Sequence, residues 1–363
     1  MNIVFRSDAS VLIGSGHVMR CLALADALTN MGGVCHFICR EHQGNFIEHI
    51  RNKGFFVHIL PVSQGKPSVD INALEYSCWL GSSQVEDAKY CSVILKELNV
   101  EWLIVDHYAL DEKWELILKP YYNKLMIIDD LADRKHVCDL LLDQNWFGTL
   151  TCNRYEDLIN NNATLLLGPK YALLKPEYEH FRNIIPVRKG TIHRILVFLG
   201  GSDPSNETKK VLEALDDFKL LGIDVVVGAN HPDPAGIIKI AVARSQVRLY
   251  SNMPHLADLM ARADLMIGAG GSTTWERMCL GLPSIVISVA ANQVSTNTSL
   301  MKEGYINFIG EAAVVTSLTI KKAVSDMLVS PCHLQRQSAL MMKLVDGAGI
   351  KSVCDYLITI RNK

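Results

Sequence analysis

The sequence predicts an α/β fold with two domains, each built on a parallel β-sheet, and three observations support this expectation. The chain has 363 residues, more than one α/β core usually holds, so two domains of about 150 to 200 residues are expected. Short runs rich in Val, Ile and Leu alternate with longer amphipathic segments, which is typical of βα units that feed a buried parallel sheet. A polar segment with Pro and Gly, residues 185–190, interrupts this alternation near the middle of the chain.

The apolar runs predict two series of strands, one on each side of that break. The first series comprises residues 3–7, 34–39, 55–60, 102–106, 125–129 and 140–143. The second comprises residues 195–199, 225–227, 247–250, 265–267 and 284–288. We therefore expect an N-terminal domain of residues 1–186 and a C-terminal domain of residues 187–363. Because open parallel sheets bind ligands at the carboxyl ends of their strands, a ligand is expected in the cleft between the two sheets, held by strand-to-helix loops.

Composition excludes several classes of protein. Hydrophobic residues make up 49% and charged residues 20% of the chain, which indicates a globular protein, and a net charge of -2 gives no basic face for nucleic acid. The N-terminus lacks a signal-peptide pattern, and no apolar run approaches the roughly 18 residues that span a bilayer. Irregularly spaced cysteines in apolar stretches favour a cytoplasmic location. No membrane association, protein partner or cofactor is indicated. Cys35, His36 and Cys39 lie on one expected strand without a second Cys pair, so no metal is expected.

The first glycine loop contains the candidate catalytic residue. Gly14-Ser-Gly16-His17 follows the first strand and opens a helix, and its glycines allow a sharp turn. The loop resembles a dinucleotide fingerprint, but Met19 occupies the third glycine position, which disfavours a dehydrogenase. The positive end of the helix favours the neutral imidazole that a general base requires, so His17 is the predicted base. The alternative is that His17 only caps the helix or bonds to a neighbouring loop.

A second glycine loop predicts a nucleotide site. Residues 264–276 are expected to form a strand, a turn with Gly271, Ser272 and Thr273, and a helix after Thr274. Glycine amides, hydroxyls and a helix N-terminus together favour a diphosphate. Glu276, in the first turn, is placed to accept the two hydroxyls of a ribose, or it complements the helix dipole. The Walker signature is absent, which disfavours an ATPase.

Three further sets of residues are weaker candidates. After the first strand of the second domain, Gly201 and Ser202 bring backbone amides to a phosphate or form a bare turn, and Asp203 with Pro204 is expected to cap the following helix. At another strand end, Ser251 and Asn252 are expected to hold a base. Arg6 and Asp8, at the end of the first strand, are expected to orient sugar amides or a water molecule, or else to form a surface ion pair.

With these residues assembled, the chain resembles the UDP-sugar hydrolases of pseudaminic acid (nonulosonic acid) biosynthesis, which release UDP from UDP-2,4-diacetamido-2,4,6-trideoxy-β-L-altropyranose. The resemblance runs nearly end to end. It rests on residues 5–8, 14–20, 105–108, 128–134, 138–145, 167–174, 200–204 and 270–272. The second half is also similar to the N-acetylglucosamine transferase of peptidoglycan synthesis.

The resemblance implies a fold and a set of roles. The fold is the GT-B architecture, in which two Rossmann-like domains with parallel sheets face each other across a cleft. By the resemblance, His17 is the catalytic base, Tyr108 lies in the active site, Asn292 and Gln293 face the sugar, and Glu276 contacts the ribose. It also implies metal-independent hydrolysis, with the N-terminal domain holding the sugar and the C-terminal domain holding UDP.

Three alternatives stay open at this point. A GT-B glycosyltransferase would pass the same UDP-amino sugar to a hydroxyl acceptor, an epimerase would interconvert UDP-sugars, and a noncatalytic sensor would bind without turnover. The additional length around residues 66–87 and after residue 330 predicts no second activity.

Overall fold

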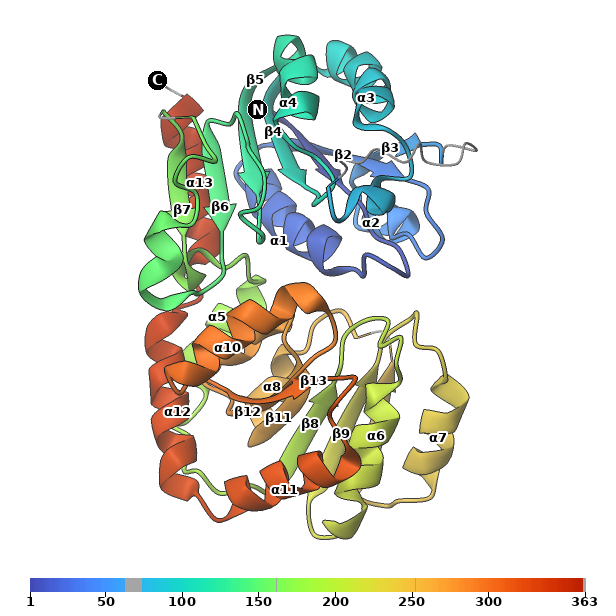
Figure 1. Cartoon of the computed structure of the whole chain (residues 1–363), viewed down its shortest axis with the longest axis vertical. Coiled ribbons are helices and arrows are strands. Elements are labelled where there is room, and N and C mark those ends of the chain that lie inside the picture. The colour runs from blue at the N-terminus through green and yellow to red at the C-terminus, as the bar shows by residue number, and fades with distance from the viewer. Residues whose placement is uncertain (63–73, 161, 252, 362–363) are drawn as a thin grey trace. The chain divides into compact units, whose positions relative to one another are not determined.

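The computed structural model describes residues 1–62, 74–160, 162–251 and 253–361, and these form two compact units (Figure 1). Unit 1 comprises Met1–Asn145, Leu150–Leu173 and Gly349–Lys363, and unit 2 comprises Trp146–Thr149 and Leu174–Ala348. Each unit contains its own parallel sheet and its own hydrophobic core, which confirms the predicted α/β class.

Unit 1 is built on a seven-stranded sheet with the order β3-β2-β1-β4-β5-β6-β7. Every neighbouring pair is parallel. The strands are β1 (Asn2–Ser7), β2 (Val34–Arg40), β3 (Phe56–Leu60), β4 (Val100–Asp106), β5 (Tyr122–Ile128), β6 (Leu140–Asp143) and β7 (Thr164–Leu167). The helices are α1 (Gly16–Asn30), α2 (Ile47–Asn52), α3 (Gln84–Leu98), α4 (Glu112–Leu118) and α13 (Gly349–Arg361), with short 3-10 turns that include η1 (Ser77–Leu80).

Both faces of this sheet are buried, as the near-continuous apolar strands require. Ile3, Phe5 and Ile104 pack in one core with α1 and α13, whereas Val4 and Leu103, the alternate residues, pack in a second core with α3 and α4. Two helices begin at side-chain caps: the Ser83 hydroxyl accepts from the Glu86 amide, and the Asp111 carboxylate accepts from the Lys113 amide.

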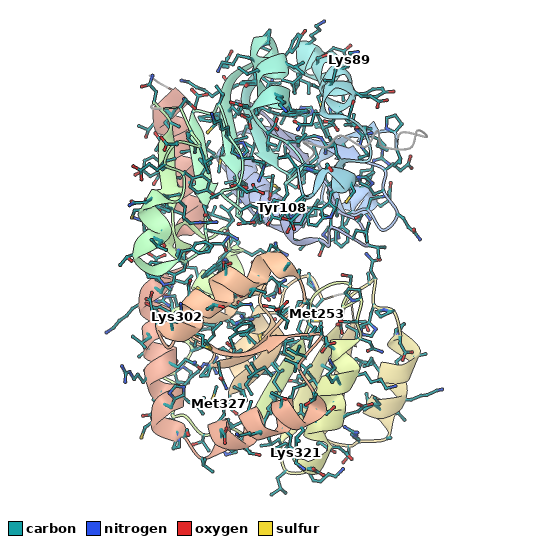
Figure 2. The ribbon with its side chains drawn as sticks, in the orientation of Figure 1. Lys89, Tyr108, Met253, Lys302, Lys321 and Met327 are labelled. Atoms are coloured by element: carbon teal, nitrogen blue, oxygen red, sulfur yellow. The ribbon has the colours of Figure 1, made fainter. Side chains whose placement is uncertain are left out.

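Unit 2 is built on a six-stranded parallel sheet with the order β10-β9-β8-β11-β12-β13. The strands are β8 (Arg194–Phe198), β9 (Gly222–Val227), β10 (Val247–Ser251), β11 (Leu265–Ala269), β12 (Ser284–Ser288) and β13 (Asn307–Glu311). The helices are α5 (Pro176–Ile184), α6 (Glu207–Ala214), α7 (Pro234–Val242), α8 (Ala257–Arg262), α9 (Thr273–Cys279), α10 (Val294–Lys302), α11 (Ser317–Leu328) and α12 (Pro331–Leu344). Met327 of α11, labelled in Figure 2, belongs to the core beneath this sheet.

The predicted domain boundary at residues 186/187 differs from the division by contacts. Helix α5 lies in unit 2, where the Arg182 guanidinium donates to the carbonyls of Cys279 (2.8 Å) and Met342 (2.7 Å). The polar stretch after it is not a free linker, because Arg188 donates to the Met260 carbonyl at 2.9 Å. At the other end of the chain, α13 returns to unit 1, where it buries Val353 and Leu357.

Two strands were missing from the prediction. β7 has four residues, of which only Leu166 is buried, and β13 is an edge strand whose pairing with β12 shifts register near Ile287. Neither presents the long apolar run that identifies a strand. Within the described ranges, no helix is both long and apolar enough to cross a bilayer.

Candidate active site

The candidate catalytic residues of unit 1 come from loops after four adjacent strands. His17 follows β1, Tyr108 follows β4, Asp130 follows β5 and Asn145 follows β6, and the sheet order places β1, β4, β5 and β6 side by side. Carboxyl ends of neighbouring parallel strands meet at one edge of a sheet, so topology alone gathers these residues. Tyr108 is labelled in Figure 2.

His17 is the second residue of α1, as predicted, and it is held by Asp106 at the end of β4. Its Nδ1 lies 2.5 Å from Asp106 Oδ1, and the residue is 9% exposed. Ser15 stands at the N-cap position of α1, but its side chain makes no capping hydrogen bond. An ionised carboxylate can only accept, so the Nδ1 proton must point to Asp106, and Nε2 is then the nitrogen with a lone pair. This arrangement orients the ring as a base through Nε2.

Arg20, one turn along α1, joins two carboxylates around His17. Its Nε lies 2.6 Å from Asp106 Oδ2, and its Nη2 lies 2.8 Å from Asp106 Oδ1 and 2.7 Å from Asp130 Oδ2. Burial favours the neutral form of Asp106, yet the Arg20 guanidinium and the His17 ring together hold the pKa of that carboxyl well below its usual range. Asp106 is therefore a permanent anion beneath the imidazole.

Tyr108 completes the group, which we call the His17 cluster: His17, Arg20, Asp106, Tyr108 and Asp130. The Tyr108 hydroxyl donates to Asp130 Oδ2 at 2.6 Å, and the Tyr108 and His17 rings meet edge to face with centroids 4.5 Å apart. Burial and the Asp130 charge raise the pKa of Tyr108 well above its usual value. The phenol therefore remains protonated and donates a hydrogen bond.

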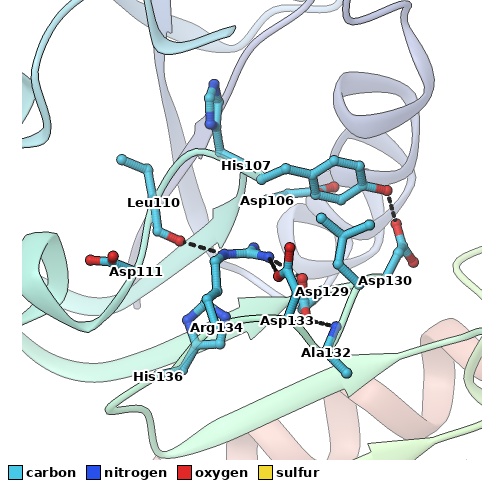
Figure 3. A network of polar contacts seen from close by, with 12 residues as sticks. Asp106, His107, Leu110, Asp111, Asp129, Asp130, Ala132, Asp133, Arg134 and His136 are labelled. Atoms are coloured by element: carbon cyan, nitrogen blue, oxygen red, sulfur yellow. Dashed lines mark hydrogen bonds and ion pairs between the residues drawn. The ribbon is translucent and has the colours of Figure 1, made fainter. Parts of the chain in front are cut away.

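A second set of polar contacts holds the loop that carries Asp130. The Arg134 guanidinium pairs with Asp129 at 2.9 Å and donates to the Leu110 carbonyl at 2.8 Å, while Asp129 accepts from the Ala132 amide at 2.8 Å (Figure 3). Burial favours the neutral acid, but Arg134 lowers the pKa of Asp129 to about 2. These bonds hold the backbone on either side of Asp130.

Arg6 and Asp8 form a buried ion pair, which corrects the alternative of a surface pair, while their contact with the sugar or a water molecule stays a prediction. Arg6 Nη1 lies 2.7 Å from Asp8 Oδ1 and its Nη2 lies 2.7 Å from Asp87 Oδ2, which also accepts from Arg40 at 2.6 Å. The Trp114 indole donates to Asp87 Oδ1 at 2.9 Å. We call Arg6, Asp8, Arg40, Asp87 and Trp114 the sealed network, because none of its members is more than 1% exposed.

The two predicted glycines shape the loop before His17. Gly14 has a φ of 78° and its amide donates to the Ser10 carbonyl at 2.9 Å, which closes a tight turn that an L side chain would strain. Gly16 is the first residue of α1. The glycines set the start of the helix and thereby the direction of His17.

In unit 2, the predicted nucleotide residues again follow adjacent strands: Gly201 and Ser202 follow β8, Gly271 follows β11, and Gln293 follows β12. Gln293 Nε2 lies 3.6 Å from the point where a Cβ on Gly271 would stand, so these two loops meet. The Gln293 side-chain oxygen accepts from the Val289 amide at 3.0 Å, which fixes the side chain. Asn292 lies beside it in the turn η6 (Ala291–Gln293).

The turn from β11 to α9 leaves polar groups at the surface. Ser272 is exposed and Thr273 is partly exposed, and the helix begins at Thr273. Glu276 is partly buried, and burial raises its pKa to about 6 even though the Tyr178 hydroxyl, Lys175 and Arg277 act to lower it. A carboxylate whose charge is poorly compensated is suited to accept hydrogen bonds from a ligand.

Asp203 caps the helix that follows it, as predicted, but that helix begins later than expected. Helix α6 begins at Glu207, not at Pro204, and the Asp203 carboxylate accepts from the amides of Glu207 (2.9 Å) and Thr208 (2.8 Å). The first amides of α6 are thus already bonded, and a phosphate cannot take them. Any phosphate at this strand end must bind at Gly201 and Ser202 instead.

Ser251, the last residue of β10, is exposed, whereas Asn252 lies outside the described residues. The Tyr250 hydroxyl accepts from Arg262 at 2.6 Å. Ser251 therefore lies at the carboxyl end of β10, which β9 and β8 separate from β11 in the sheet, and its contact with a base stays a prediction.

Sequence reasoning missed the residues that hold His17. Arg20, Asp106 and Asp130 stood within the motifs that carried the resemblance, but no role was assigned to them. The signal was present, because Asp106 ends a buried apolar strand and a charge in that place needs a partner. For Tyr76 and Trp79, which lie in the additional length before α3, no pattern in the sequence indicated a functional role.

Comparison with known proteins supports the resemblance. Residues 195–348 match the family described as glycosyltransferase family 28 C-terminal domain. The chain is 26% identical over 305 residues to the UDP-2,4-diacetamido-2,4,6-trideoxy-beta-L-altropyranose hydrolase of Campylobacter jejuni, covering 84% of this chain and 98% of that protein. The predicted resemblance to that hydrolase is confirmed.

Solved structures with the same fold are glycosyltransferases. The fold is similar to that of Acinetobacter baumannii MurG, with a TM-score of 0.66 and 12% identity over 99% of both chains. It is also similar to LpCGTa in complex with UDP, with a TM-score of 0.68 and 12% identity over 99% of both chains. At this identity the likeness establishes the fold, and it confirms the two Rossmann-like units of the GT-B class.

Proposed function

We propose that the protein hydrolyses UDP-2,4-diacetamido-2,4,6-trideoxy-β-L-altropyranose to UDP and the free sugar, in pseudaminic acid biosynthesis. The observation that carries the proposal is the His17–Asp106 pair, because a base oriented through Nε2 is the group that a hydrolase needs to activate water. Similarity to a hydrolase of that name supports the choice of substrate.

The proposed reaction is a single displacement at the anomeric carbon. His17 Nε2 takes a proton from water, the water oxygen bonds to the anomeric carbon, and the bond from that carbon to the diphosphate oxygen breaks with inversion. The imidazolium that forms is stabilised by the anionic Asp106 at 2.5 Å. Tyr108 and Arg20 keep Asp130 and Asp106 in place, so the ring does not turn during the proton transfer.

UDP is proposed to bind in unit 2. The glycine turns at Gly201 and Gly271 offer backbone amides to the diphosphate, with hydroxyls at Ser202, Ser272 and Thr273, and Glu276 accepts the ribose hydroxyls. The UDP complex of a structural neighbour supports this choice of nucleotide. Asn292 and Gln293 are proposed to face the sugar. Hydrolysis is proposed to need no metal ion.

A glycosyltransferase is the second candidate, favoured by the match of residues 195–348 to a glycosyltransferase domain. In that reaction His17 would take the proton from an acceptor hydroxyl instead of water. The two reactions differ in one measurable respect, since a transferase needs an acceptor before it releases UDP.

The deciding experiment uses the proposed substrate in water enriched in the heavy oxygen isotope, with EDTA and without an acceptor. We expect free sugar that carries the label, and unlabelled UDP, by mass spectrometry. Label in UDP would mean attack at phosphorus and would overturn the mechanism. Intact substrate would overturn hydrolysis in favour of a transferase or a noncatalytic binding protein.

A further inference from the structure

Two aromatic side chains from the segment before α3 lie against the His17 cluster. The Trp79 ring stacks on Tyr108 with centroids 5.4 Å apart and planes 22° apart, and Tyr76 meets Tyr108 edge to face at 5.3 Å. Tyr76 and Trp79 also contact each other, with centroids 4.7 Å apart. We call Tyr76, Trp79 and Tyr108 the aromatic wall.

The wall borders the proposed base directly. The His17 ring lies 4.5 Å from Tyr108 and 6.2 Å from Trp79, edge to face in both cases. Tyr108 is buried, but Tyr76 and Trp79 are only partly buried. Part of the surface of Tyr76 and of Trp79 is therefore exposed, and the Trp79 ring is a direct neighbour of the imidazole.

Described residues on the C-terminal side hold this segment in place. Leu80 is buried in the core that α3 and α4 share, and Ser83 caps α3 by accepting from the Glu86 amide at 3.2 Å. Gly81 has a φ of 68°, and a Cβ there would stand 2.8 Å from the His42 ring. The backbone directly after Trp79 is thus anchored by packing and by a helix cap, which limits where the indole can lie.

Aromatic surface beside a base selects ligands by chemistry. A ring face binds the C–H groups and methyl groups of a sugar, whereas hydroxyls pressed against it lose their hydrogen bonds with water. A trideoxy sugar with two acetamido groups offers methyl groups and few hydroxyls, so it meets an aromatic face at a smaller desolvation cost than a fully hydroxylated hexose does.

We propose that Trp79 is a specificity-determining residue that contacts the apolar face of the sugar and selects N-acylated deoxy sugars over hydroxylated ones. The proposal rests on the proposed function and adds to it the residue that recognises the sugar. The aromatic wall is proposed to contact the sugar and not the bond that breaks at the anomeric carbon. Replacing Trp79 should therefore change the Michaelis constant more than the turnover number.

The test compares Trp79→Ala and Trp79→Phe with the unaltered protein. The substrates are UDP-2,4-diacetamido-2,4,6-trideoxy-β-L-altropyranose and UDP-N-acetylglucosamine. For Trp79→Ala we expect KM for the deoxy sugar to rise about tenfold or more, with kcat within about threefold, and a smaller change for UDP-N-acetylglucosamine. Trp79→Phe should restore most of the affinity. Tyr90→Ala, which removes an exposed aromatic side chain from α3, is the control and should change neither constant.

Equal losses on both substrates, or a fall in kcat at constant KM, would overturn the proposal and leave Trp79 with a structural role. If the protein does not hydrolyse the UDP-sugar at all, the proposal for Trp79 is tested by binding instead. Calorimetry then measures the affinity of each variant for the intact UDP-sugar and for UDP. Loss of affinity for the UDP-sugar but not for UDP in Trp79→Ala supports the proposal even then. Unchanged affinity for the UDP-sugar refutes it.

Discussion

Two of the arginine–carboxylate networks in unit 1 have similar chemistry but differ in how far they reach toward the surface. In the sealed network, Asp87 bonds to Arg6, Arg40 and Trp114, and all four residues are at most 1% exposed. In the His17 cluster, Asp106 is equally buried, but the side chains of its partners His17 and Arg20 are 10% and 7% exposed. Both carboxyl groups have a lowered pKa despite burial, because arginines compensate them.

The comparison shows that a lowered pKa and short ion pairs do not by themselves mark a site. Each of the three guanidinium nitrogens of Arg6 donates to a buried carboxylate. His17 has one nitrogen committed to Asp106 and the other available. We expect the first network to stabilise the fold and propose that the second performs the chemistry, and separate substitutions should separate these roles.

The largest effect is expected for His17→Gln. Loss of the base should lower kcat by about 10² to 10⁴-fold, the usual contribution of general base catalysis. The affinity for UDP should not change, because UDP is proposed to bind in unit 2. Turnover is measured by release of UDP, and affinity by calorimetry; unchanged turnover would reject His17 as the base.

Asp87→Asn should have the next largest effect, on stability. Removing the charge leaves Arg6 and Arg40 buried with reduced compensation, and breaking a buried ion pair costs about 3 to 5 kcal/mol. Urea unfolding followed by circular dichroism measures the loss. Asp26→Asn is the matched control, since Asp26 pairs with Lys53 at 3.0 Å near the surface and should change stability by less than about 1 kcal/mol. Equal losses in the two variants would contradict a structural role for the sealed network.

These roles mark the limit of what the sequence could predict. The β-strands with long apolar runs, the helix at His17 and the glycine turns follow from local pattern. That Arg6 pairs with Asp87 depends on packing between residues far apart in the chain, and no local signal separates it from a surface ion pair. For the same reason the contact of Trp79 with Tyr108, and the return of α13 to unit 1, could not be predicted.

Tyr108→Phe should have a smaller effect. The hydroxyl bond to Asp130 is lost, but Asp130 keeps Arg20 at 2.7 Å and Asn145 at 2.9 Å, so the stability loss should be at most about 1.5 kcal/mol. The aromatic contact with His17 remains. We expect a fall in kcat smaller than that of His17→Gln, measured in the same assay. An effect as large as that of His17→Gln would mean that Tyr108 itself takes part in proton transfer.

The smallest effect expected is the pH dependence of ligand affinity that Glu276 causes. Burial raises the pKa of Glu276 to about 6, whereas the pKa values of Asp87 and Asp106 are lowered. The folded protein therefore holds this proton more tightly than an unfolded chain, and ionising Glu276 between about pH 4.5 and 6 costs stability. If the ionised carboxylate accepts the ribose hydroxyls, affinity for UDP-N-acetylglucosamine should be constant above about pH 7. It should fall by up to about tenfold between pH 7 and pH 5, as the proton returns.

This ligand is the right probe because its diphosphate, esterified at both ends, takes up no proton in that range, whereas the terminal phosphate of UDP does. Glu276→Gln cannot titrate, so its affinity should be lower at pH 7 and flat with pH, and calorimetry across the range measures both. A variant that retains the pH dependence would place the titrating group elsewhere. Equal affinities of the two proteins at pH 7 would mean that Glu276 does not contact the ribose and serves only the end of α9.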